Sequence, residues 1–240
     1  EVADASVVNP FQPQTSLSKE VGFKSELMDG RARLNVAVFQ NSIDDQHITQ
    51  LLPGTTQSLV TNAGESTYQG FEVEFALQLS EDWRLSGNYG CLDSSYDKNP
   101  DSPIVFTNGV PATDSTAPLI DTASNRLPGY APEATYSLQL NGTLARLSVG
   151  EVNLMIDYSF TDEMYLYSVN KSLTAPNAGG SYSSAINGIP SIENLNARLS
   201  LNDVSVGSGT MDFSFFVRNA TDEDKMIQGI DFGMFRTANW

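Results

Sequence analysis

Few residues of this chain combine the types and the spacing that catalysis requires. The single histidine, His47, follows Asp44 and Asp45, and serines are plentiful, so the residue types of a Ser-His-Asp triad are all present. No Gly-x-Ser-x-Gly elbow accompanies these residues, and no other pattern supports a nucleophile. We therefore predict no catalytic residue and no enzyme, and a hydrolase ranks last among the functions weighed below.

Metal and phosphate chemistry find equally little support. One histidine and one cysteine nearly exclude a zinc site of the usual kind. Asp93, Asp97 and Asp101 are evenly spaced at every fourth position, unlike the alternating ligands of an EF-hand loop. The glycine-containing segments lack the spacing of phosphate-binding loops. We expect no resident metal ion and no cofactor.

Glu72 and Glu74 form the one carboxylate pair with a formal resemblance to a glycosidase site. They alternate with apolar residues, and side chains two positions apart lie on the same face of a strand. A polar wall along a sheet is the simpler interpretation of this pair.

The elements that position these residues are strands. Apolar residues recur at every second position in about eight runs, and a period of two places successive side chains on opposite faces of a sheet. In the run Phe71–Leu79 the odd positions are apolar, and the runs Val152–Phe160 and Met211–Val217 alternate in the same way. One face is thus apolar, while the other carries full charges.

The gaps between runs alternate between short and long. The expected short connections are Met28-Asp29-Gly30, Ser80-Glu81-Asp82, Gly142–Gly150 and Gly207-Ser208-Gly209, and the expected long ones are Ile43–Tyr68, Asp93–Tyr130 and Thr161–Ile192. A soluble antiparallel sheet shows the same alternation of side chains, so periodicity alone does not decide. Short turns at one end and long loops at the other favour an outer-membrane barrel.

Composition narrows the classes further. The net charge of -16 argues against nucleic acid as a partner, because phosphate binding needs a basic surface. A single cysteine, Cys91, excludes an internal disulfide, and its phase places it on the apolar face with Trp83, Leu85 and Tyr89. The chain starts at Glu1 without an initiator methionine or a signal peptide, so we expect a processed product or a fragment.

Short motifs occur in a defined order along nearly the whole chain. They are Phe11-Gln12-Pro13-Gln14, Lys19–Ser25, Asp29–Phe39, Asp44-Asp45-Gln46, Asn62-Ala63-Gly64, Gly70–Glu74, Arg126-Leu127-Pro128, Ala131-Pro132, Asn194–Arg198, Val217–Glu223 and Phe235–Trp240. The first two resemble the "F-x-P-E … E-x-G-x-K-S/T" segment of TonB-dependent outer-membrane receptors. The others resemble later barrel segments of the same family, in the same order.

The resemblance implies an all-β fold, in which an antiparallel meander of about eight strands is part of a transmembrane barrel of roughly 22 strands around a plug. Residues 1–240 would be a C-terminal segment of that barrel, roughly strands 14 to 21, with the plug and the final strand outside it. The implied partners are outer-membrane lipid, the remaining barrel and plug, TonB through the N-terminal region, and a small-molecule nutrient. The implied function is active uptake of an iron-siderophore, a cobalamin or an oligosaccharide.

Two groups of residues are candidates for ligand contact. Aromatic side chains of the loops offer large contact areas with few torsions to freeze; they are Tyr96, Phe106, Tyr130, Tyr165, Tyr167 and Tyr182. Tyr165 and Tyr167 also suit an aromatic girdle at the membrane interface. The candidates for the lumen face are Arg31, Arg33, Glu72, Glu74, Asp157, Arg198 and Arg218, and a structural ladder of cross-strand charges is the simpler account of this set. A passive porin-like barrel and a soluble β-sandwich binding module remain the alternatives.

Overall fold

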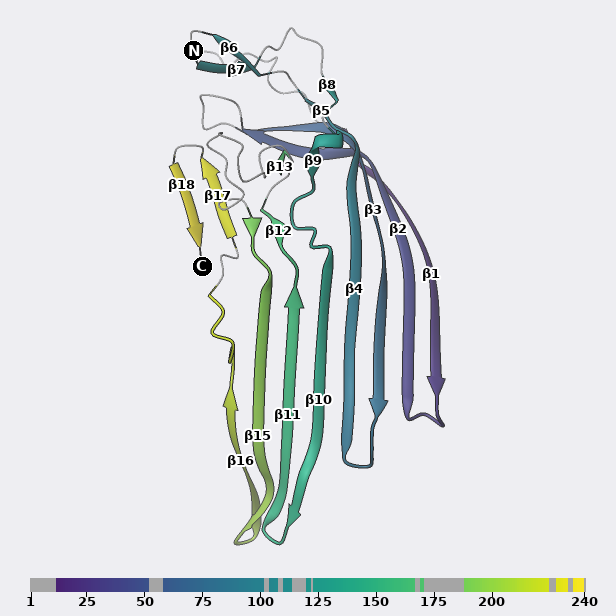
Figure 1. Cartoon of the computed structure of the whole chain (residues 1–240), viewed down its shortest axis with the longest axis vertical. Helices are drawn as coiled ribbons and strands as arrows, with labels where there is room; N and C mark the ends of the chain where they lie inside the picture. The colour runs from purple at the N-terminus through teal and green to yellow at the C-terminus, as the bar shows by residue number, and fades with distance from the viewer. Residues whose placement is uncertain are drawn as a thin grey trace.

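The computed structural model describes residues 12–51, 58–101, 104–107, 110–113, 120–121, 123–166, 169–170, 188–224, 228–232 and 235–239. Eight long strands dominate it: β1 (Thr15–Leu27), β2 (Ala32–Leu51), β3 (Ser58–Gln78), β4 (Trp83–Lys98), β10 (Ala134–Leu147), β11 (Gly150–Thr161), β15 (Ile192–Val206) and β16 (Gly209–Val217). They form one antiparallel sheet in the order in which they occur along the chain (Figure 1). The expected meander of about eight strands is confirmed.

The two ends of the sheet differ. Tight turns join the strands at the lower end in Figure 1, whereas the smaller elements gather at the upper end. These smaller elements are β5 (Pro100–Asp101), β6 (Ile104–Thr107), β7 (Val110–Thr113), β8 (Ile120–Asp121), η2 (Ala123–Asn125), β9 (Arg126–Leu127), β12 (Met164–Tyr165), β13 (Val169–Asn170), β14 (Gly188–Ile189), β17 (Gln228–Phe232) and β18 (Phe235–Asn239). We call the first end the turn end and the second the loop end.

Two of the expected connections are wrong in extent. The segment Ile43–Tyr68 is predicted to be a loop, but β2 continues to Leu51 and pairs with β3 from Ser58 onward. The stretch Gly142–Gly150 is largely strand as well, with a bulge after Thr143 and a turn of only two residues. Apolar alternation reports which side chains avoid water, while backbone pairing continues through polar residues that the alternation leaves unmarked.

The loop end carries short pairs of strands within the other two long connections. β4 extends to Lys98, so the first residues of the expected loop Asp93–Tyr130 are strand. The remainder contains η2 and the pairs β5–β8 and β6–β7, while Met164 and Tyr165 pair with Ile189 and Gly188 in the connection after β11. Leu166 and Ile189 are buried there and pack with Met164 and Ile192.

One face of the large sheet is apolar across all eight strands. A row of rings crosses it near the loop end, with centroid distances of 5.7 Å for Phe71–Tyr89, 6.4 Å for Tyr89–Tyr136 and 4.9 Å for Tyr136–Phe160. Trp83 lies on the same face near the turn end. At about 3.3 Å per residue, Trp83 and Tyr89 are roughly 20 Å apart along β4. That separation suits the apolar band between the aromatic girdles of an outer-membrane barrel.

The apolar face stays uncovered by the described residues. Val21 and Phe215, on the two outermost strands β1 and β16, are 79% and 78% exposed. A soluble sandwich would bury such side chains beneath a second sheet, and the described residues supply none of comparable size. No helix in this part of the chain is long and apolar enough to cross a membrane.

Candidate functional site

The charged residues singled out in the sequence share the face opposite the apolar one. Directly paired residues of neighbouring strands lie on the same face. The pairs that connect this set are Arg33 with Ala76, Glu74 with Asn88, Asn88 with Ser137, Gln139 with Asp157, Asp157 with Asn196 and Arg198 with Phe216. Glu72 is two positions from Glu74 on β3, and Arg218 is two positions from Phe216. We call this surface the polar face.

Cross-strand hydrogen bonds hold several of its side chains. Asn35 donates its amide to Glu74 Oε2 at 3.1 Å, and Asn196 donates to Asp157 Oδ1. Arg198 donates to Ser214 Oγ at 3.3 Å. Arg31, which immediately precedes β2, donates to the carbonyl oxygen of Gln78 at 3.2 Å. Part of this charge is therefore structural, because it ties neighbouring strands together.

Several hollows lie along the polar face of the described residues. One of about 550 Å³ is lined by Arg84, Asn141, Asn153, Arg198 and Asp212, among others. A second, of about 330 Å³, is lined by Arg33, Glu74, Arg84, Ser137 and Asp157. Amides, hydroxyls and ions of both signs alternate along these walls. Such a surface can bind water and polar solutes, but within the described residues it gathers no group of three or more metal-ligating side chains.

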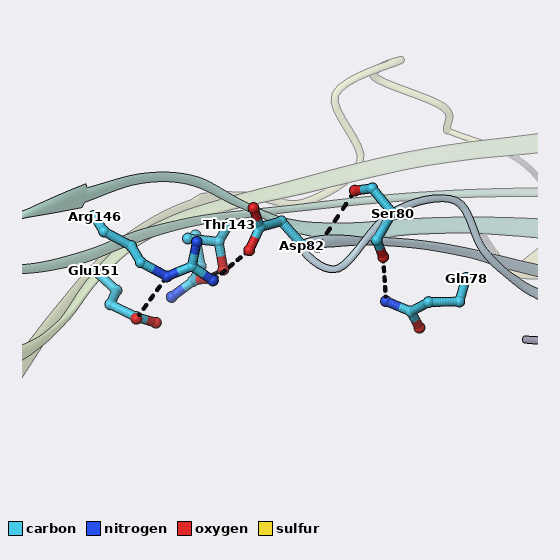
Figure 2. Close-up of polar contacts among 7 residues, drawn as sticks. Gln78, Ser80, Asp82, Thr143, Arg146 and Glu151 are labelled. Carbon is cyan, nitrogen blue, oxygen red and sulfur yellow. Dashed lines mark hydrogen bonds and ion pairs between the residues drawn. The ribbon is translucent and has the colours of Figure 1, made fainter.

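An ionic cluster joins two hairpins at the turn end. Arg146 of β10 contacts Asp82 in the β3–β4 turn, and its Nε donates to Glu151 Oε1 at 3.2 Å (Figure 2). The backbone of Thr143 also donates to the carbonyl oxygen of Asp82 at 3.1 Å. The hydrogen bond from Arg146 lowers the pKa of Asp82 below its usual range. The cluster fixes how the two turns sit relative to each other.

At the loop end, Asp121 organises the chain that follows β4. Its Oδ1 accepts hydrogen bonds from the backbone nitrogens of Asn99 and Ala123, both at 3.0 Å. These bonds, the one from Asn99 first, lower the pKa of the Asp121 carboxyl. Asn99 and Ala123 are buried, so this part of the loop packs firmly against the top of β4.

The two long connections meet each other above the sheet. Tyr130 donates its backbone N–H to the carbonyl oxygen of Tyr165 at 2.7 Å. Beside this bond, β9 pairs with β13 through Leu127–Val169 and Arg126–Asn170. The connection between β4 and β10 and the connection between β11 and β15 are therefore joined by backbone contacts.

The predicted aromatic contact residues fall into different environments. Tyr130 is 55% exposed, whereas Tyr165 is half-buried. Tyr96, expected in a loop, lies within β4 and is only 9% exposed. Phe106 lies in β6, and Tyr167 and Tyr182 lie outside the described residues. The structure thus brings Tyr130 and Tyr165 together through their backbones.

Sequence reasoning missed three polar-face residues with a place in this site: Arg84, Arg146 and Phe216. Phe216 follows Phe215 and so falls on the polar face, where the guanidinium of Arg218 lies 5.2 Å from its ring centroid. Two adjacent phenylalanines in an alternating strand were the available signal. The sequence carries no comparable signal for Arg146, because a bulge in β10 sets the register that brings Arg146 beside Glu151.

The family model described as "TonB dependent receptor-like, beta-barrel" matches residues 2–220. The chain belongs to this family. Its members are outer-membrane β-barrel proteins.

Individual relatives agree with this assignment. The chain is 27% identical over 182 residues to a probable TonB-dependent siderophore receptor, PiuA, of Acinetobacter baumannii, covering 71% of this chain and 23% of that protein. The ferric yersiniabactin uptake receptor FyuA of Yersinia pestis has a similar fold, with a TM-score of 0.63 and 16% identity over 96% of this chain and 28% of FyuA. The ferric-catecholate import receptor Fiu of E. coli K12 matches with a TM-score of 0.60 and 16% identity, over 95% of this chain and 26% of Fiu. The chain spans about a quarter of the length of each.

Proposed function

We propose that this chain forms a sector of the wall of an outer-membrane receptor that binds a nutrient chelate and imports it with energy delivered through TonB. The observation that carries the proposal is that the same eight strands present a continuous apolar face and a continuous charged face. In a closed barrel the first face contacts lipid and the second lines a wet lumen.

The polar face supplies the lumen wall in this proposal. The residues that then face the interior are Arg31, Arg33, Glu72, Glu74, Asp157, Arg198 and Arg218. Water or a plug domain supplies hydrogen-bond partners to those of their polar groups that are not bonded within the sheet. A small barrel of about eight strands fills its interior with side chains, and this many ions would not pack there. A wide barrel with further strands beyond β1 and β16 suits the same residues.

The joined loops supply the outer binding surface. Tyr130 presents an exposed ring at the point where the two long connections meet, and aromatic rings are efficient contact groups for a bulky chelate. An iron-siderophore is the ligand class that we favour, because the relatives named above are siderophore or ferric-chelate receptors.

Uptake in whole cells tests the proposal. The full-length receptor, expressed in a bacterial strain without siderophore receptors of its own, is expected to restore accumulation of radioactive iron from a ferric siderophore. Deletion of tonB should abolish this accumulation while leaving the receptor in the outer membrane. Accumulation that persists without TonB would identify a passive channel instead and refute the proposal.

A further inference from the structure

The outer part of the β2–β3 hairpin extends beyond its neighbours in the sheet. Pairing between β1 and β2 stops at Asp44, and pairing between β3 and β4 stops at Glu65. Within the described residues, 47–51 and 58–62 then pair only with each other. We call these two short stretches the arm. A two-stranded hairpin is marginally stable in water, so the arm needs further contacts to keep one position.

The backbone bends where the arm leaves the sheet. The register between β2 and β3 shifts on both sides of Gln46, and Asp45 adopts a positive φ of 53°. Bulges of this kind bend a strand and increase its local twist. On β3, a Cβ atom at Gly64 would clash with the carbonyl oxygen of Lys98, so glycine is needed at the bend. Figure 1 shows the outer ends of β2 and β3 turned across the loop end of the sheet.

Two side chains of the arm bind the chain that enters β1. The Asn62 amide accepts a hydrogen bond from the backbone nitrogen of Gln12 at 2.7 Å and donates to the carbonyl oxygen of Gln12 at 2.8 Å. His47 Nε2 donates to the same carbonyl oxygen at 2.7 Å, because a carbonyl oxygen can only accept. The backbone nitrogen of His47 donates to Gln14 Oε1 at 3.3 Å. Asn62 thus pairs with both backbone groups of Gln12, as a neighbouring strand would.

These bonds differ from the other cross-strand contacts of the sheet. Asn35, for example, bonds to Glu74 between strands that backbone pairing already joins. The arm has no third strand among the described residues, so the bonds to Gln12 take that place. His47 and Asn62 are direct cross-strand partners, so both strands of the arm contribute. Asn62 also donates to the carbonyl oxygen of Asp45 at 2.9 Å, which ties the bend to the same side chain.

We propose that Asn62 and His47 form a latch that holds the arm folded over the loop end and couples it to the chain that enters β1. Opening the latch frees the arm to swing about Asp45 and Gln46, while the eight-stranded sheet stays paired. The latch gives the single histidine of the chain a conformational role. The inference goes beyond the proposed function, because it concerns the position of the arm and requires no ligand.

Amide hydrogen exchange of the full-length receptor in lipid vesicles tests the latch. Asn62→Ala removes the bonds to Gln12, so exchange should accelerate about tenfold in both strands of the arm and in residues 12–16. Gln12→Pro removes the N–H that Asn62 accepts, and it should accelerate exchange in the arm although position 12 lies outside it. Coupling between two sites is reciprocal, so each substitution should be detected on both sides.

Asn35→Ala is the matched control, because it removes a cross-strand amide of the same hairpin inside the sheet. It should leave exchange in the arm at the wild-type rate. An unchanged arm in Asn62→Ala would overturn the latch, and acceleration confined to residues 12–16 in Gln12→Pro would overturn the coupling. If Asn62→Ala accelerates exchange in β10 and β11 to the same extent, Asn62 supports the whole sheet and the proposal is refuted. Uptake of iron is not measured in this experiment, so its result is independent of the proposed function.

Discussion

Tyr130 and Tyr165 are joined by a backbone hydrogen bond of 2.7 Å, although they belong to different connections of the sheet. Tyr130 adopts this position with a φ of 51°, in the left-handed region that non-glycine residues rarely occupy. The neighbouring β9–β13 pair reinforces the contact. The two loops are therefore expected to open as one unit.

Replacing Tyr130 by proline tests this coupling. Proline has no N–H to donate to Tyr165 and cannot adopt a positive φ, so both features are lost together. Amide hydrogen exchange should accelerate about tenfold or more in peptides covering residues 123–133 and 162–166, because losing such a bond costs roughly 1–2 kcal/mol. Tyr130→Gly keeps the N–H and suits the backbone, so it should preserve protection. Unchanged exchange around Tyr165 in the proline variant would contradict the coupling.

The register of β11 gives a second prediction. Ile156 lies on the apolar face and pairs with Ala197, whereas Ser159 lies on the polar face and pairs with Asn194. Ile156→Arg in the full-length receptor should lower the free energy of unfolding in lipid vesicles by about 2–4 kcal/mol, because the charge is placed in hydrocarbon. Ser159→Arg should lower the free energy of unfolding much less. Denaturant titration in vesicles measures both, and equal costs would show that the faces are assigned wrongly.

The strands and their faces could be predicted because alternation directly records which side chains share each face of a sheet. The position of Cys91 among apolar residues follows from the same rule, and its pairing with Phe71 and Ala134 agrees. The extension of β2 to Leu51 could not be predicted, since polar residues pair their backbones without leaving a pattern.

Fewer contacts of the candidate site could be predicted from the sequence. Arg146 is distant in sequence from Asp82, and only the three-dimensional register with its bulge brings them together. Likewise, the polar surroundings of Tyr96 in the sequence predict a loop, but Tyr96 lies within the longer β4 and is buried.

Trp83 and Gly142 give a third prediction. They are direct partners on β4 and β10, and a Cβ atom at position 142 would lie 2.3 Å from the Trp83 ring. Gly142→Ala should displace the indole and cost about 1–3 kcal/mol of stability by overpacking. Trp83→Leu should relieve this clash, so the stability lost by the double variant should be smaller than the sum of the losses of the two single variants. Additive losses in unfolding experiments would mean that the ring does not cover the glycine.

The ionic cluster at the turn end predicts a pH dependence. The pKa of Asp82 lies below its ordinary value of 3.8 in the folded chain, chiefly because of the hydrogen bond from Arg146. A carboxyl whose pKa is lowered by folding stabilises the fold above its unfolded pKa and loses that contribution as the pH falls through its folded pKa. The wild-type receptor should therefore exceed Asp82→Asn in stability by a constant amount near neutral pH. The difference should shrink as the pH falls below about 4, where the unfolded-state carboxyl titrates.

Glu81→Gln is the matched control, because Glu81 lies in the same turn but joins no ion pair among the described residues. Chemical unfolding of all three proteins between neutral and acidic pH measures the effect. A wild-type advantage that stays constant into acid would show that it does not come from the charge of Asp82, and that the ion pair with Arg146 does not stabilise the two turns.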